Sequence, residues 1–105
     1  MSTFGMHQSL FPVFPMQVEL YGRPQIIAGR RNVNIRVSEN ALMQDIITAL
    51  AEVCPELVGD VILEDCSGLK SSYIFNLNGT TFLDNEMIHL KPDDTMLLFS
   101  SQAGG

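Results

Sequence analysis

The sequence predicts an α+β fold in which a mixed sheet of four to five strands carries one main helix packed on one face. Several short segments alternate apolar and polar residues with the two-residue period of strands. One segment, residues 42–53, repeats apolar residues at helical spacing instead. Asn78-Gly79 separates two β-rich segments and predicts a hairpin, because both residues tolerate positive φ. A single helix covers one sheet face and leaves the other to solvent or a partner.

The N-terminal half predicts a hairpin followed by the helix. Residues 16–21 and 32–37 alternate as strands, and residues 22–31 predict a connection with a short apolar turn. Ser38 or Asn40 can cap the helix, and Pro55 ends it because proline lacks the helical N–H. The expected buried face of the helix consists of five apolar residues: Leu42, Ile46, Ala49, Leu50 and Val53.

The C-terminal half predicts three more strands. Residues 56–71 predict a loop with a short extended or helical element, and residues 73–77 and 80–83 form the two strands of the Asn-Gly hairpin. The Lys-Pro-Asp-Asp sequence at 91–94 predicts a tight turn before a last apolar strand at 95–99.

We expect a single domain at residues 16–99, because 105 residues with 46% apolar content suit one modest core. Residues 1–15 lack charge and periodicity and are expected to be a disordered leader, with a Phe-Pro docking peptide as the alternative. Residues 100–105 have nothing to bury and are expected to be a flexible tail.

The charge pattern argues against nucleic-acid and membrane partners. The chain has 6 basic and 12 acidic residues, a formal net charge of −6 and a pI near 4.6. Nucleic-acid binding needs a basic face, and an acidic membrane surface repels an acidic protein. From Ser38 onward only Lys70 and Lys91 oppose eleven acidic side chains, which indicates a protein partner with a basic surface. Arg30-Arg31 is either part of a partner site or a solvated turn.

Two cysteines are too few for a disulfide scaffold and form no metal-binding pair, so cytoplasmic residence is expected. The chain also lacks an apolar run of roughly 18 residues, which a membrane span needs, and a secretory signal pattern.

No catalytic or metal-binding constellation is predicted. His89 follows Asp84 and Glu86 without metal-ligand spacing on a rigid element. Cys54 is expected in or near the core, and acidic neighbours of Cys66 disfavour its thiolate. We therefore expect no catalytic residue, no bound cofactor and no enzyme activity of the chain by itself.

The C-terminal Gly104-Gly105 pair is the chemical feature that stands out. Glycine lacks Cβ, so such an end can pass through a narrow channel and adopt the backbone shape that an enzyme requires. A carboxylate is a poor acyl donor, but coupling to AMP supplies a leaving group that a sulfur nucleophile can displace.

These features resemble the MoaD/ThiS family of sulfur carriers, which are ubiquitin-like β-grasp proteins. The resemblance covers residues 16–105 and rests on YIFNLNG at 73–79, LKPDD at 90–94, MLLF at 96–99 and the terminal diglycine. The stretch between helix and hairpin resembles the longer MoaD-like carriers. Ser100-Ser101-Gln102 departs from the prolines that many molybdopterin-type carriers have before the diglycine.

The resemblance implies that an E1-like enzyme of the MoeB or ThiF type uses ATP to adenylate Gly105, which then becomes a thiocarboxylate. A sulfur-accepting enzyme subunit would take the sulfur for molybdopterin, thiamin, cysteine or tRNA thiolation. It also implies that an apolar patch on the open sheet face docks on these partners, and strand alternation places Tyr21, Leu97 and Phe99 there. Two alternatives stay open: a protein modifier joined to lysines through Gly105, and a β-grasp interaction module whose diglycine has no role.

Overall fold

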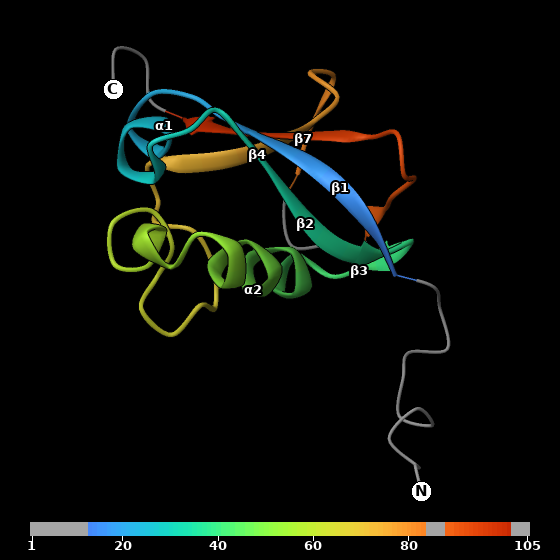
Figure 1. Ribbon diagram of the computed structural model, residues 1–105, viewed down its shortest axis with the longest axis horizontal. Helices are drawn as coiled ribbons and strands as arrows, with labels where there is room; N and C mark the ends of the chain where they lie inside the picture. Colours follow the sequence, from blue (N-terminus) through green and yellow to red (C-terminus); the bar gives the residue numbers. More distant parts are fainter. Residues whose placement is uncertain (1–12, 84–87, 102–105) are drawn as a thin grey trace, which may run out of the picture.

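The computed structural model of the protein describes residues 13–83 and 88–101 (Figure 1). Five strands form one sheet in the order β2-β1-β7-β4-β5, and β3 pairs with β6 in a separate two-stranded ribbon. The strands are β1 (Val13–Leu20), β2 (Asn32–Ser38), β3 (Asn40–Ala41), β4 (Tyr73–Leu77), β5 (Thr81–Phe82), β6 (Ile88–His89) and β7 (Thr95–Ser100). The helices are α1 (Arg23–Ala28), α2 (Met43–Val53) and the 3₁₀ helix η2 (Pro55–Leu57).

The main sheet is mixed because its two central strands, β1 and β7, run parallel. β1 pairs antiparallel with β2, and β7 pairs antiparallel with β4. Helix α2 lies against one face of this sheet (Figure 1). The predicted mixed sheet with one main helix on one face is therefore confirmed.

The core lies between α2 and the sheet. Every second residue of β1, β2 and β7 points toward the helix, as strand alternation requires. Fully buried side chains at its centre include Val18, Leu20, Ile35, Ile46, Ile47, Leu50, Phe75, Met96 and Leu98. The helix therefore buries Ile47 as well as the predicted Ile46 and Leu50, whereas Leu42 is 48% exposed.

Helix α2 begins later than the two predicted caps allow. Asn40 belongs to β3 and pairs with His89, so Leu42 is the N-cap residue. Leu42 has no polar side chain to offer, and Asp45 instead accepts a hydrogen bond from the Leu42 N–H at 3.0 Å. The capping predictions for Ser38 and Asn40 were wrong, because pairing with a strand distant in sequence takes these residues.

The expected domain limits at residues 16 and 99 need correction within the described residues. Pro15 lies in β1 opposite Arg36, and β1 begins at Val13. At the other end, Ser100 lies in β7 opposite Tyr73. Strand pairing, rather than apolar patterning, extends the sheet in both directions. The remaining residues of the predicted leader and tail lie outside the described residues.

Residues 22–31 contain a six-residue helix, α1, where an apolar turn was expected. Pro24 at its start suits the first turn of a helix, where no N–H is needed, and Gly29 ends it with φ 75°. The Asn-Gly turn is as predicted, with φ 57° at Asn78 and 75° at Gly79. Asn78 also ties the hairpin to β7, because its Oδ1 accepts from the Thr95 N–H at 2.8 Å.

Candidate functional site

The sheet face opposite α2 brings the three predicted interface residues together. Tyr21, Leu97 and Phe99 line a shallow apolar depression of about 310 Å³. Tyr21 follows the last residue of β1 and donates its backbone N–H to the Leu98 carbonyl at 3.0 Å. The parallel pairing of β1 and β7 therefore places Tyr21 beside the end of β7. All three side chains are half-buried, and so they remain accessible to a partner.

Two further apolar residues extend this depression across the sheet. Ile74 on β4 lies opposite Phe99, and residues opposite each other share a face. The Phe82 ring lies 6.1 Å from the Phe99 ring, and Phe82 is 62% exposed. We call the five residues Tyr21, Ile74, Phe82, Leu97 and Phe99 the open-face patch. Ile74 and Phe82 were not predicted from the sequence, although strand alternation around Phe75 and the position of the Asn-Gly hairpin indicate that both point to the open face.

A polar cluster fixes Tyr21 at the border of the open-face patch. Its phenol donates a 2.5 Å hydrogen bond to a Glu19 carboxylate oxygen, and the Arg31 guanidinium lies 4.3 Å from the ring centre. The other Glu19 oxygen accepts from the Gln17 amide at 3.2 Å. The hydrogen bond to Glu19 raises the pKa of Tyr21 above 10.0, because it favours the protonated phenol. The ring is thus held in place before any partner arrives.

The strand that carries Leu97 and Phe99 also leads to the C-terminus. Ser101 is held at the end of β7, because its backbone N–H donates to the Ser72 carbonyl at 2.7 Å. Its hydroxyl lies 3.3 Å from the Ser71 carbonyl oxygen. Helix α1 packs beside this end of β7 (Figure 1). Gly104 and Gly105, the predicted adenylation and thiocarboxylate site, lie outside the described residues.

The other candidates from the sequence do not form a reactive site in the described part of the chain. His89 lies on β6, and its Nδ1 shares a 2.8 Å hydrogen bond with Asn40 Oδ1. Cys54 is fully buried beside the Arg30 guanidinium, and Cys66 is half-buried. Among residues 13–83 and 88–101, no three His, Cys, Asp or Glu side chains lie close enough to hold a metal ion. Asp84 and Glu86 lie outside these residues.

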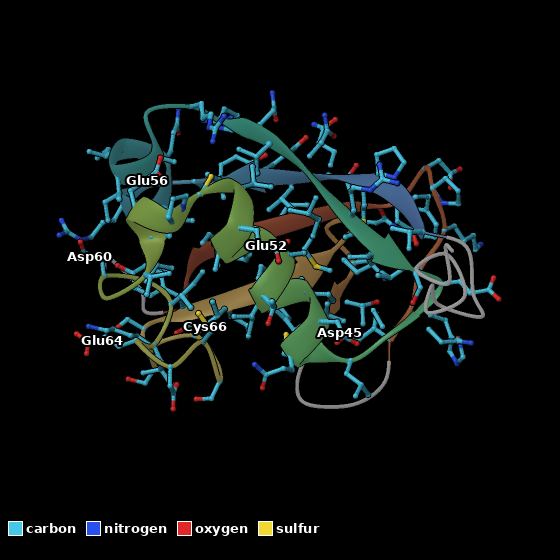
Figure 2. All side chains as sticks on the ribbon, turned by 60° about the horizontal axis from the view of Figure 1, so that its bottom comes forward. Asp45, Glu52, Glu56, Asp60, Glu64 and Cys66 are labelled. Carbon is cyan, nitrogen blue, oxygen red and sulfur yellow. The ribbon has the colours of Figure 1, made fainter. Side chains whose placement is uncertain are left out.

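The helical side of the molecule has a different character from the open face. Figure 2 shows acidic side chains spread over α2, η2 and the loop that follows. These are Asp45, Glu52, Glu56, Asp60 and Glu64. Within the described residues, Asp60 makes an ion pair with Arg23 at 3.1 Å. These five carboxylates thus lie on the helical side of the molecule, whereas Glu19 is the acidic residue at the border of the open-face patch.

The described residues contain no helix with the length and apolar content that crossing a membrane requires. No protein-family model matches the sequence, and no curated protein matches it at a significant level.

Solved structures of small proteins share the fold over nearly their whole length. Small archaeal modifier protein 1 from Haloferax volcanii is 25% identical, with a TM-score of 0.71 over 87% of this chain and 99% of that one. Small archaeal modifier protein 1 from Methanosarcina acetivorans is 19% identical, with a TM-score of 0.69 over 90% of this chain and 99% of that one. A protein from Pyrococcus furiosus described as molybdopterin converting factor subunit 1 is 20% identical, with a TM-score of 0.60 over 83% and 97%.

These matches confirm what the resemblance to the MoaD and ThiS carriers implied about the fold. The chain is a ubiquitin-like β-grasp protein, and its structural neighbours are small archaeal modifier proteins and a molybdopterin-converting-factor subunit.

Proposed function

We propose that this protein is a sulfur carrier whose Gly105 carboxylate is adenylated by an E1-like enzyme and then converted to a thiocarboxylate. The acceptor of the sulfur belongs to a cofactor, cysteine or tRNA-thiolation pathway. The protein acts as a carrier or small subunit with partner enzymes and performs no catalysis alone. Its partners are the adenylating enzyme, of the MoeB or ThiF type, and a sulfur-accepting subunit.

One observation carries the proposal: the open-face patch and the chain end share strand β7. Phe99 lies two residues before Ser101, and Ser101 is fixed to the 71–72 segment by two hydrogen bonds. In the proposed function residues 102–105 link Ser101 to the reactive carboxylate, and four residues span at most roughly 14 Å. An enzyme that docks on the patch would therefore need its reactive centre within that distance of Ser101. Docking and chemistry are coupled by the length of the tail.

The chemistry would be supplied by the partner. A Gly105 carboxylate oxygen attacks the α-phosphorus of ATP, and pyrophosphate leaves. A persulfide of the partner then attacks the carbonyl carbon, and AMP leaves with the electron pair of the broken C–O bond. A partner thiolate next attacks the partner's own sulfur in this acyl disulfide, which releases the thiocarboxylate on Gly105 and leaves a disulfide on the partner. The chain contributes an unhindered terminal carbonyl and a body that the enzyme recognises. ATP is thus a substrate of the partner and is not held by this protein.

A protein modifier is the second candidate, because two of the structural neighbours are described as small archaeal modifier proteins. In this function Gly105 would end in an amide bond to a lysine of another protein. Both functions need the same activated terminal glycine, and they differ in the nucleophile that receives the acyl group.

Intact-mass spectrometry of protein purified from its native host tests the proposal. We expect a fraction of the molecules to carry sulfur in place of one C-terminal oxygen when sulfur demand is high. Lysine adducts of Gly105 without any thiocarboxylate would favour the modifier. Deleting Gly105 should abolish activation while the melting temperature stays unchanged. Gln102→Ala is the matched control, since it alters the tail without altering its terminal carboxylate. Full function of the deletion variant would refute both candidates.

A further inference from the structure

Asn76 is a buried polar residue beneath the open-face patch. It lies opposite Leu97 on β7 and opposite Phe82 on β5, and it alternates along β4 with Phe75, which belongs to the core. Strand alternation therefore turns the Asn76 side chain toward the open face. Asn76 is nevertheless only 4% exposed, whereas Phe82 in the same row is 62% exposed. The apolar residues of the patch thus cover a polar side chain.

The side-chain oxygen of Asn76 has no hydrogen-bond donor among residues 13–83 and 88–101. The hydroxyl of Tyr21, the polar hydrogen that the patch itself carries, donates to Glu19 instead. An unpaired buried acceptor destabilises a fold, and an apolar side chain of similar size would avoid this loss. Most buried polar groups in proteins have partners for that reason. We therefore expect a docking partner to supply the missing donor.

Two aromatic rings lean toward each other across β4, the strand that carries Asn76. Phe99 on β7 and Phe82 on β5 have β4 between them, so their backbones are roughly 10 Å apart. The centres of the two rings are only 6.1 Å apart. Phe82 is the more exposed of the two and belongs to a two-residue strand at the sheet edge. A rotamer change of Phe82 is therefore the simplest way to expose the Asn76 oxygen, because exposed side chains change rotamer readily.

The surroundings of Asn76 restrict the group that can pair with it. An amide oxygen only accepts hydrogen bonds, so the partner must donate. Tyr21, Leu97 and Phe99 line the apolar depression of about 310 Å³, where a cation would lose its hydration. Glu19 at the border is already engaged by Tyr21 and does not compensate such a charge. A neutral donor on an apolar side chain fits best. The indole of tryptophan meets this condition, because its N–H only donates and brings no acceptor that needs a partner.

We propose that Asn76 is a specificity-determining residue of the open-face patch and accepts a hydrogen bond from a tryptophan indole of the docking partner. The Phe82 ring turns aside as the indole enters the apolar depression beside Leu97. The partner is the adenylating enzyme, and in this respect the proposal rests on the proposed function. The hydrogen bond itself is a property of this chain and can be tested without the enzyme.

Indole and 1-methylindole form a matched pair of probes, because methylation removes the N–H donor and keeps the apolar rings. Each is titrated into the full chain while NMR follows the side-chain amide signals of Asn76 and the methyl signals of Leu97. Indole should shift both sets of signals and bind roughly threefold more tightly or better, which is the difference that one hydrogen bond supplies. Equal affinities, no binding of either probe, or shifts that leave Asn76 unchanged would overturn the proposal.

Asn76→Leu removes the acceptor and keeps the size of the side chain. It should abolish the preference for indole, and the melting temperature of the free protein should stay the same or rise because no unpaired acceptor remains. Asn34→Leu is the matched control, since Asn34 is an exposed strand residue outside the patch. It should keep the preference. A preference that survives Asn76→Leu would contradict the role of Asn76, whatever the melting temperature.

Binding to the adenylating enzyme separates this proposal from the proposed function. Asn76→Leu should weaken binding roughly fivefold or more. Full affinity of Asn76→Leu, with weakened binding of Phe99→Asp, would overturn the role of Asn76 and leave the proposed function intact. Wild-type protein that the enzyme neither binds nor adenylates would refute the proposed function and the choice of partner, while the two probes still decide the hydrogen bond.

Discussion

The two faces of the main sheet differ in burial, although their residues alternate along the same strands. Leu98 points to α2 and is fully buried, whereas its neighbour Leu97 points to the open face and is half-buried. Both are leucines in β7, so composition does not distinguish them. Their position relative to the main helix α2 distinguishes them. One face of a strand therefore serves stability while the other remains available for recognition.

The two sides of the molecule also differ in charge. The helical side displays the acidic residues of α2, η2 and the following loop (Figure 2), whereas the centre of the open-face patch is apolar. A charged surface disfavours nonspecific association, and an exposed apolar patch of several residues is typical of a binding site. The open-face patch therefore has the character of a binding site, and we propose that the partners of the proposed function dock there.

The largest expected effect is a difference in the free energy of unfolding between alanine variants of the two neighbouring leucines. Leu98→Ala should lower the free energy of unfolding by about 2–5 kcal/mol, because it leaves a cavity beneath α2. Leu97→Ala should lower it by about 1 kcal/mol or less, because Leu97 is half-buried and no helix among residues 13–83 and 88–101 packs over the open face. Urea denaturation followed by circular dichroism measures both. Equal losses would show that the open face is packed as tightly as the core.

The next effect concerns docking and depends on the proposed function. Phe99→Asp should weaken binding to the adenylating enzyme by a factor of about 10 or more, because it places a charge in the centre of the patch. Leu63→Asp is the matched control, since Leu63 is a 38% exposed apolar residue outside the patch. Calorimetric titration with the enzyme compares the two. Equal affinities would remove the open-face patch from the interface.

The smallest effect is spectroscopic and probes the border of the patch. The hydrogen bond to Glu19 raises the pKa of Tyr21, so Tyr21 should ionise above pH 10.0. A raised folded-state pKa stabilises the fold below the ordinary value, and this contribution is lost as pH rises through the raised value. Glu19→Gln should shift the ultraviolet titration of Tyr21 toward 10.0. An unshifted titration would show that Glu19 does not hold the ring.

Prediction from sequence worked where a local pattern coincided with the final packing. Strand β4 at 73–77 and the turn at Asn78-Gly79 were predicted correctly, because alternation and positive φ are properties of adjacent residues. The start of α2 was predicted wrongly, because Asn40 pairs with His89, 49 residues away. Helix α1 was missed because six residues between two glycines give too short a pattern. The role of Gly104 and Gly105 as the adenylation and thiocarboxylate site remains a prediction.

The sequence by itself determined the composition of the two sheet faces, the turn chemistry and the diglycine end, since these depend on residue type and spacing. Only the tertiary structure decided which residues of the open face meet. Tyr21 and Phe82 are far apart in the chain, and the pairing of β7 with both β1 and β4 brings them to one patch. It also decided that β2 lies at one edge of the sheet, because strand order follows from packing the strands together against the main helix α2.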